Sequence, residues 1–378
     1  MKFLHLSDLH IGKRVHECPM IEEQKYVFDQ ITNIIDFNAI EAVLIAGDVY
    51  DKSVPSAEAV QLFDSFLTKL AKRKLHVFVI SGNHDSAERI AFGSEIMQNV
   101  NVYMSPVYNG SVQPVKLNDE FGSINIYMLP YIKPVHVRSI FEDAQIESYN
   151  DAVKFAIKQM NVDTSERNVI LSHQFVTGAS TCESEEMSIG GVENIDAEAY
   201  DDFDYVALGH IHSPQKCKRE TLRYCGSPLK YSFSEAGHIK SAVIVEMGEK
   251  GKTRIETVPL DPMHDMREIK ESYSTLASKS YYDGTATDDY LHIILTDEVP
   301  IPGAADKLRV IYPNLLLLDY ENLKNSSSVA DANAADVKNK KPIELLKDFY
   351  FIQNGKEMSE FQTEFAKKII EEAEEEAK

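Results

Sequence analysis

The sequence has little of what marks a secreted or membrane-embedded protein. It contains four cysteines among 378 residues, and no two of them form a CxxC pair. That usage fits a reduced cytoplasmic protein in which each cysteine packs in the core or lies on the surface. No apolar run is long enough to cross a bilayer, and the first residues lack the basic and apolar segments of a signal peptide. We therefore expect a cytoplasmic protein with no membrane partner.

The chain is also short of positive charge. It has 39 Lys and Arg against 60 Asp and Glu, a formal net charge of −21. Proteins that hold nucleic acid alone are usually basic, so a phosphate-rich substrate would need local basic patches, metal ions or a partner. Part of the acid lies in the block 371–376, which is most simply a solvated helix end. The charge balance therefore does not exclude DNA.

Apolar runs alternate with helical periodicity in the first hundred residues. Residues 2–6, 42–46 and 76–80 are typical of buried strands, and the segments between them carry apolar residues at helical spacing. This alternation predicts a layered α/β fold with right-handed crossovers. Further strands are expected at 125–129, 168–171 and 204–208, with a hairpin of 242–246 and 254–258. We expect two β-rich sheets with loops that line a common cleft.

Side chains that can bind metal follow these strands directly. They are Asp8, His10, Asp48, Asn83, His84, His173, His210 and His212. Because open α/β sheets place ligand sites at the carboxyl ends of their strands, we expect these residues to converge. A single Gly-Asp after a strand is usually only a turn. Three successive strand ends with such residues favour a metal site.

The mixture of imidazoles, carboxylates and a carboxamide indicates the kind of metal. It suits Mn²⁺, Fe or Zn²⁺ better than Mg²⁺, which prefers oxygen ligands and retained water. The ligands are too many for one ion but enough for two that share a bridging carboxylate. Two ions about 3.5–4 Å apart can bind a phosphate, generate hydroxide and neutralise charge as the P–O bond breaks. The pattern therefore predicts phosphoester hydrolysis.

Five blocks carry a resemblance to a known family. They are Asp8-Leu9-His10, Gly47-Asp48, Gly82-Asn83-His84-Asp85, His173 and Gly209-His210-Ile211-His212. In this order they resemble the calcineurin-like metallophosphoesterase superfamily. The flanking segments 7–13, 46–51 and 226–235 look like its SbcD branch of double-strand-break repair nucleases. The implied fold is a layered α/β/β/α sandwich with a small α+β capping domain and C-terminal helices.

The resemblance also implies a role for each motif residue. The ligands would be Asp8, His10 and His212 for the first ion, Asn83, His173 and His210 for the second, and Asp48 as the bridge. His84 would protonate the leaving oxygen or stabilise charge on the phosphate. Asp51 would orient His84 through a carboxylate–imidazole pair, the alternative for Asp51 and Asp85 being a turn-capping role. The histidines interpreted as structural are His5, His16, His76 and His136.

The activity implied by the resemblance is that of a nuclease with two divalent ions, expected to be Mn²⁺. It comprises 3′→5′ exonuclease action on double-stranded DNA and endonuclease action at hairpins and single strands, in DNA repair, recombination and replication at the nucleoid. The implied partner is the SbcC ATPase, in a heterotetramer with two copies of each chain. The alternative is a small-substrate metallophosphatase or phosphodiesterase of the same superfamily, which needs neither cap nor C-terminal helices. A non-catalytic scaffold is disfavoured because the ligand set is complete.

Composition divides the chain into four parts. They are 1–262, a small α+β module at 263–323, a flexible linker at 324–341 and a helical segment at 342–378. The resemblance implies that these parts, apart from the linker, are a nuclease domain, a DNA-capping domain and a partner-binding segment. Within the cap, a helix is expected over 267–278. In the last segment Phe361, Phe365 and Ile369 recur every four residues, so this stripe packs either on a coiled coil of the partner or on the chain's own core.

Two further surfaces are candidates for contacts. Residues near the motif loops are expected to contact DNA phosphates, and the alternative for each is an ordinary solvated surface position. They are Lys13, Arg14, Arg89, Lys230 and Tyr231. The apolar stripe over 60–70, with Ile90 and Phe92 beyond it, resembles the family's dimer helices. A homodimer is therefore expected, although packing of this stripe on its own sheet remains open.

Overall fold

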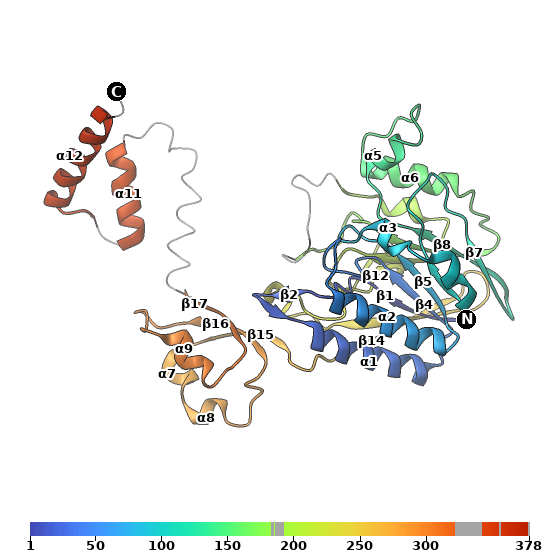
Figure 1. Ribbon diagram of the computed structural model, residues 1–378, viewed down its shortest axis with the longest axis horizontal. Helices are drawn as coiled ribbons and strands as arrows, with labels where there is room; N and C mark the ends of the chain where they lie inside the picture. Colours follow the sequence, from blue (N-terminus) through green and yellow to red (C-terminus); the bar gives the residue numbers. More distant parts are fainter. Residues whose placement is uncertain (183–184, 186–192, 322–341, 355–356, 377–378) are drawn as a thin grey trace. The chain divides into compact units, whose positions relative to one another are not determined.

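The computed structural model describes residues 1–182, 185, 193–321, 342–354 and 357–376 (Figure 1). The chain forms two compact units, Met1–Arg267 and Glu268–Lys378. The predicted linker at 324–341 lies outside the described residues, and the predicted domain boundaries stay predictions.

Two six-stranded sheets form the centre of the first unit. The first has the order β14-β13-β1-β4-β5-β6, with β1, β4, β5 and β6 parallel and β13 antiparallel to both of its neighbours. Its strands are β1 (Lys2–Leu6), β4 (Ala42–Ala46), β5 (His76–Ile80), β6 (Val102–Met104), β13 (Ser241–Met247) and β14 (Thr253–Pro259). The parallel strands place their carboxyl ends at one edge.

The second sheet has the order β11-β12-β10-β9-β8-β7, with β12, β10, β9 and β8 parallel. Its strands are β7 (Val115–Asp119), β8 (Gly122–Leu129), β9 (Arg167–His173), β10 (Tyr205–Gly209), β11 (Gln215–Cys217) and β12 (Arg219–Tyr224). A separate two-stranded ribbon consists of β2 (Arg14–Val15) and β3 (Cys18–Pro19).

Helices cover the outer face of each sheet. In the first unit the helices are α1 (Ile21–Asn38), α2 (Ala57–Lys72), α3 (Ala87–Ile90), α4 (Ser94–Met97), α5 (Pro134–Arg138) and α6 (Tyr149–Gln159), with the 3₁₀ turns η1 (Gln98–Val100), η2 (Ala197–Tyr200) and η3 (Phe233–Glu235). Helices α1 and α2 pack on the first sheet, and α5 and α6 pack on the second. The layers run helix, sheet, sheet, helix, so the predicted α/β/β/α sandwich is confirmed.

Central strands such as β4 are apolar along their whole length because both faces of the sheet are buried there. Along β1, Phe3 faces the second sheet while Leu4 faces α1 and α2. Along β4, Leu44 likewise faces the second sheet and Val43 faces the helices. This alternation of period two fixes the register, since a slip of one residue would exchange the two faces.

The second unit contains a three-stranded sheet and several helices. Its elements are β15 (Met266–Glu271), α7 (Tyr273–Leu276), α8 (Lys279–Tyr282), β16 (Tyr290–Leu295), α9 (Ala304–Arg309), β17 (Leu315–Tyr320), α11 (Pro342–Asn354) and α12 (Glu360–Glu376). The sheet order is β15-β16-β17, with β16 and β17 parallel. Helices α11 and α12 lie against each other, and Gln362 Nε2 donates to the Tyr350 hydroxyl at 3.1 Å. No helix of the described chain is both long enough and apolar enough to span a membrane.

The predicted helix over 267–278 is wrong, because its first part is strand β15. In β15, Ile269 is packed against the core of the second unit, and its neighbours Glu268 and Lys270 differ from it in polarity, the period-two alternation of a half-covered strand. The helix begins only after Ser272, whose side chain accepts a hydrogen bond from the Thr275 amide as an N-cap.

A buried ion pair joins the two sheets at the end opposite the strand-end motifs. Arg167 at the start of β9 donates to both carboxylate oxygens of Asp119, at 2.5 and 3.1 Å. Arg167 also donates to the Gly248 carbonyl at 2.9 Å, which follows β13 of the other sheet. The Arg167 and Asp119 side chains are only 3% and 5% exposed. Hydrogen bonds from Arg167 hold the pKa of Asp119 well below its usual range.

We predict that Asp119→Asn lowers the free energy of unfolding by about 3–5 kcal/mol at pH 7, since it leaves Arg167 buried without its counter-charge. The stabilisation by Asp119 is present above the unfolded carboxyl pKa of about 4 and is lost as the pH falls through the lower folded value. The difference between parent and variant should therefore shrink below about pH 4. Urea unfolding midpoints measured from pH 7 to pH 3 check this. The control is Asp201→Asn, which removes an exposed pair with Arg219 and should cost less than about 1 kcal/mol. Equal midpoints for parent and Asp119→Asn at pH 7 would contradict the account.

Candidate metal centre

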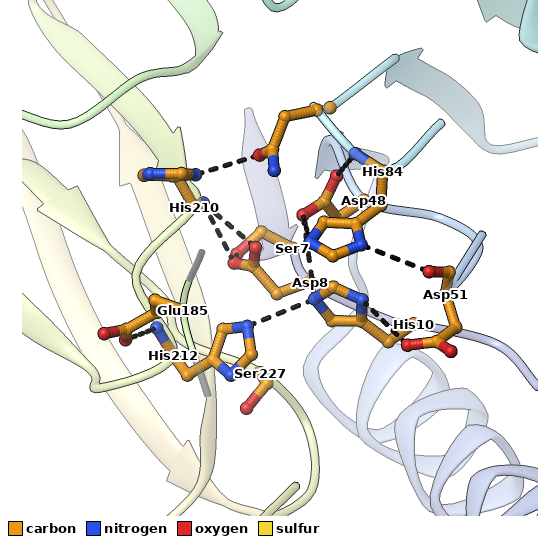
Figure 2. Close-up of polar contacts among 12 residues, drawn as sticks. Ser7, Asp8, His10, Asp48, Asp51, His84, Glu185, His210, His212 and Ser227 are labelled. Carbon is orange, nitrogen blue, oxygen red and sulfur yellow. Dashed lines mark hydrogen bonds and ion pairs between the residues drawn. The ribbon is translucent and has the colours of Figure 1, made fainter. Parts of the chain in front are cut away.

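The seven predicted metal ligands meet where the two sheets bring their strand ends together. Figure 2 shows Asp8, His10, Asp48, His210 and His212 among them. The first sheet contributes residues from the loops after β1, β4 and β5, and the second sheet contributes residues from the ends of β9 and β10. In chain order the ligands are Asp8, His10, Asp48, Asn83, His173, His210 and His212. His173 is the last residue of β9 rather than a loop residue, because that strand is longer than predicted.

Three glycines allow the two strand-end regions to approach this closely. A Cβ on Gly209 would lie 1.9 Å from the Ala46 carbonyl oxygen, across the boundary between the sheets. A Cβ on Gly47 would lie 2.3 Å from His173 Nδ1, and one on Gly82 would lie 2.1 Å from Asp48 Oδ1. Glycine precedes these motifs because any side chain would displace a predicted ligand or the strand end behind it.

The loops that carry the ligands have an unusual backbone. Asp8, His10, Asp48 and His210 have φ values of 52°, 42°, 48° and 103°. Such conformations cost about 1–3 kcal/mol for residues with a side chain and persist where their surroundings impose them. Here the Asp8 and His10 amides donate to the carbonyls of Gly47 and Asp48 at 3.1 and 3.0 Å. Strain is thus concentrated where the side chains must converge.

The first group of ligand atoms lies between β1 and the loop after β10. His10 Nε2 and His212 Nε2 are 3.1 Å apart. A carboxylate oxygen of Asp8 lies within 4.8 Å of both imidazoles. Asp8 also accepts a hydrogen bond from the His210 amide at 3.0 Å, which links the two sheets. This is the set that the resemblance assigns to the first ion.

The second group surrounds Asn83. Its Oδ1 is 3.0 Å from His173 Nε2 and 3.0 Å from His210 Nδ1. Asp48 lies between the two groups, with Oδ2 3.3 Å from His173 Nε2 and 3.6 Å from His10 Nε2. The structure therefore gathers the side chains in the two sets implied by the resemblance, and the assignment of an ion to each set stays a prediction.

Burial and mutual proximity determine the charge of these groups. Burial, helped by the neighbouring His173, lowers the pKa of His210 to about 3. Burial also keeps the pKa of His10 well below its usual value. Burial would raise the pKa of Asp48, but His173 holds it below the usual range. Burial opposes charge on His173, yet Asp48 raises its pKa to about 9.

The residues present fit divalent cations. The imidazoles of His10 and His210, whose pKa values burial lowers, offer lone pairs. The Nε2 atoms of His10 and His212 face one another in a buried site. The carboxylates and the Asn83 carbonyl supply the oxygen ligands that Mn²⁺, Fe and Zn²⁺ accept together with imidazole. Buried polar atoms gathered in this way are stabilised by a cation between them.

His84 lies beside both groups, and a nitrogen of its ring lies within 4.8 Å of potential ligand atoms of His10 and Asp48. The resemblance nevertheless assigns it to neither ion. Its ring meets the His10 ring edge-on at 4.8 Å, and its amide donates to Asp48 Oδ1 at 2.9 Å. His84 Nδ1 lies 3.1 Å from the backbone carbonyl of Asp51. A carbonyl only accepts, so Nδ1 carries the hydrogen, and Nε2 lies on the side of Asp48, 4.0 Å from its Oδ2. The side chain is 14% exposed and can reach a substrate.

The predicted carboxylate–imidazole pair between Asp51 and His84 is not formed. The Asp51 carboxylate instead pairs with Lys13 at 2.8 Å, and Asp51 orients His84 through its main chain. Asp85 has the turn-capping role, since its carboxylate accepts the amides of Val49, Tyr50 and Gly82 at 2.9–3.0 Å. Burial raises the pKa of Asp85 to about 6, helped by the charge of Asp48.

The residues expected to contact DNA are placed differently from one another. Arg14 and Arg89 are exposed, whereas Lys13 is engaged with Asp51. Lys230 pairs with Asp265 at 2.8 Å and is mostly buried. The expectation for Tyr231 does not fit, because this residue is 3% exposed and its hydroxyl donates to the Leu9 carbonyl at 2.5 Å.

Two residues that support the centre were not predicted from the sequence. Gln24 on α1 is buried, donates to the His10 carbonyl at 2.7 Å and accepts the Gly12 amide at 3.0 Å. Its signal in the sequence is a polar residue on the apolar face of a helix, three positions before Val27. Glu235 is the other, a fully buried carboxylate next to His212.

Comparison with known proteins agrees with this geometry. Residues 1–214 match the calcineurin-like phosphoesterase family, and residues 262–354 match the family described as type 5 capsule protein repressor C-terminal domain. The chain is 29% identical over 377 residues, 98% of either chain, to the SbcD subunit of the SbcCD nuclease from Staphylococcus epidermidis. The predicted resemblance to the SbcD branch is confirmed.

Solved structures add little to this result. A dimetal phosphatase from Danio rerio aligns with 69% of this chain and 99% of its own, at 11% identity and a TM-score of 0.37. A protein from Thermus thermophilus aligns over the same shares at 9% identity and a TM-score of 0.40. These similarities are too low to support an argument about this chain.

We predict that His84→Gln lowers turnover of a small phosphodiester by about 10²–10⁴-fold, because it removes a proton donor next to the ligands. Two equivalents of Mn²⁺ should remain bound, since the resemblance assigns His84 to neither ion even though it lies close to His10 and Asp48. Metal analysis after gel filtration, together with a chromogenic phosphodiester assay, checks both. The matched control is His173→Gln, which should lose one equivalent. Loss of metal from His84→Gln would show that its assigned position outside the ligand set is wrong.

Proposed function

The chain belongs to the calcineurin-like phosphoesterase family, and we propose that it is the DNA-cleaving subunit of an SbcCD-type nuclease. As a member of the family it is a metal-dependent hydrolase of phosphate esters. The observation that carries the proposal is similarity to an SbcD protein over 98% of both chains, cap and C-terminal region included. A small-substrate phosphatase would need the metal centre but not these further 100 or so residues.

The proposed reactions are 3′→5′ exonuclease action on double-stranded DNA and endonuclease action at hairpins and single strands. They place the protein in repair, recombination and replication of DNA, and therefore in the cytoplasm at the nucleoid. In this proposal DNA is cut by residues 1–262 and covered by the capping domain at 263–323. A linker at 324–341 connects this domain to the segment 342–378, which binds the partner. The alternative, a small-substrate phosphatase or phosphodiesterase, uses the same centre.

In the proposed mechanism each group of side chains has a separate task. Asp8, His10 and His212 would hold one ion, Asn83, His173 and His210 the other, and Asp48 both. Two divalent ions, Mn²⁺ in this proposal, would polarise the phosphate and activate water at neutral pH. The buried ligands exclude bulk water and keep the oxygens and nitrogens directed at one point.

His84 would act on the substrate itself. The Asp51 carbonyl holds Nδ1–H, which fixes the ring and directs Nε2 toward the phosphate site beside Asp48. From there a protonated Nε2 donates to the leaving oxygen or stabilises charge on the phosphate. The Asp51 main chain orients the ring, whereas the Asp51 carboxylate forms no ion pair with the ring and pairs with Lys13.

The partner surface is proposed on α12. Phe361, Phe365 and Ile369 are 78%, 58% and 49% exposed, so the neighbouring helix α11 does not bury this stripe. A detached amphipathic helix of this kind buries its apolar face in a groove or coiled coil of another protein. We assign it to SbcC, in an assembly with two copies of each chain.

A second apolar surface supports the proposed homodimer. The stripe over 60–70 divides, with Phe63, Phe66 and Leu70 buried on the sheet and Val60 44% exposed. Beyond it, Phe92 is 81% exposed, whereas Ile90, which was expected on the same surface, is 4% exposed and therefore does not belong to it. Ile96 is 76% exposed. Large exposed side chains close together in the sequence favour an interface over solvent. Most apolar side chains of α2 instead pack on the chain's own sheet, as the other interpretation of the stripe expected.

The proposal predicts that this chain with SbcC, ATP and Mn²⁺ cleaves a DNA hairpin, and that omission of SbcC strongly lowers the rate because the acidic chain alone holds DNA poorly. Gel analysis of an end-labelled hairpin measures both. The His84→Gln variant is the control for contaminating nuclease. No cleavage, together with rapid turnover of a small phosphodiester by the same preparation, would favour the small-substrate alternative.

We also predict that the double variant Phe365→Glu and Ile369→Glu loses co-elution with SbcC, because two charges replace the apolar contacts. The control, Lys367→Gln with Lys368→Gln, changes the net charge of the same helix by the same two units and should co-elute. Size-exclusion chromatography compares them, and metal content should equal that of the parent in both. Unchanged co-elution of the Glu variant would show that this stripe does not bind SbcC and would favour the alternative that it packs on the chain's own core.

A further inference from the structure

A buried ion pair lies directly behind His212. Glu235 ends η3, and Lys240 comes just before β13. The Glu235 side chain is 0% exposed, that of Lys240 is 3% exposed and that of His212 is 2% exposed. Burying two opposite charges rarely stabilises a fold more than an apolar pair of the same volume does. Stability alone therefore gives no reason for this pair.

The pair holds His212 at two places. Lys240 Nζ contacts Glu235 Oε2 and also donates to the His212 carbonyl at 2.8 Å and to Ser227 Oγ at 2.9 Å. Glu235 Oε1 lies 3.4 Å from His212 Nδ1 and accepts the Tyr231 amide at 3.3 Å. The main chain and the ring of His212 are thus both attached to the ion pair.

The ring contact determines which nitrogen is available to a metal. The Glu235 carboxylate, ionised beside Lys240, only accepts, so His212 Nδ1 carries the hydrogen. The lone pair is then on Nε2, on the other side of the ring, where it faces His10 Nε2 at 3.1 Å (Figure 2). A carboxylate behind a ligating imidazole also makes the imidazole a stronger donor to the metal.

The second ligand group has a weaker counterpart of this arrangement. His173 directs its Nδ1 at the Ala46 carbonyl, 2.8 Å away, which is a neutral acceptor. The two groups therefore differ in the acceptor that faces an imidazole Nδ1. For His212 this acceptor is a carboxylate, and for His173 it is a neutral carbonyl.

We propose that Glu235 is a positioning residue for His212, that Lys240 holds the Glu235 carboxylate in place, and that the pair selectively strengthens binding of the first ion. The inference rests on the two-metal centre of the proposed function. It assigns to segment 226–240 a part in metal binding without direct contact with the metal. It also gives the buried pair a reason independent of folding.

The test is titration of the metal-free full chain with Mn²⁺. Electron paramagnetic resonance of free Mn²⁺ and calorimetry measure the binding. In Glu235→Gln the affinity of one of two sites should fall by about 10–100-fold, the usual effect of removing such a partner, while the other stays at the parent value. The matched control is Glu23→Gln. Glu23 is likewise buried and lies 2.6 Å from a histidine nitrogen, that of His264, which belongs to neither ligand group. It should leave both affinities unchanged.

A second variant guards against misfolding of Glu235→Gln, in which Lys240 keeps an uncompensated charge. Glu235→Leu with Lys240→Met replaces the pair by apolar side chains and should keep the parent unfolding midpoint. It should show the same selective loss. Parent affinities in this variant, or equal weakening of both sites, would overturn the proposal. A parent chain that binds fewer than two ions would instead overturn the two-metal centre.

Discussion

The close contact between the carboxyl ends of two β-sheets is the constraint on which the rest of this structure depends. Asp8 and Asn83 belong to one sheet and His173 and His210 to the other, so neither sheet contains a complete ligand set. Hydrogen bonds cross this boundary directly, among them those from His173 Nδ1 to the Ala46 carbonyl and from the His210 amide to Asp8. Glycines without a Cβ make the approach sterically allowed. The apolar interface below, with Phe3, Leu44 and Val169, stabilises this arrangement through burial of both sheets.

Much of the first unit was predictable because its central strands, such as β4, are buried on both faces and are therefore apolar. The convergence of the predicted ligands was foreseeable because each lies at or shortly after the end of a strand, where parallel strands end together. Segment 267–278 was not, since β15 has only a weak alternation and its neighbour β16 determines the pairing. The contact of His84 with the Asp51 main chain, and the burial of Tyr231, depend on loop conformation that residue type does not encode. Glu235 was similarly hidden, because its ion pair with Lys240 is local in sequence but its contact with His212 is not.

The structure also suggests how an acidic chain can act on a polyanion. The centre itself is compact and largely buried, and of the cations expected beside it only Arg14 and Arg89 are exposed. Cations bound by the centre would contact the phosphate that is cut, while longer-range attraction to DNA would come from a partner. The exposed apolar stripe of α12 is consistent with a chain that works in an assembly. In this account chemistry and DNA binding are divided between subunits.

The central claim is that residues of both sheets bind two ions with Asp48 between them. Diffraction from crystals of the parent chain grown with Mn²⁺, recorded at the manganese absorption edge, tests it most directly. The account predicts two anomalous peaks about 3.5–4 Å apart. One should lie at His10 and His212 and the other at Asn83, His173 and His210, with Asp48 contacting both. A single peak, or peaks away from these side chains, would contradict it.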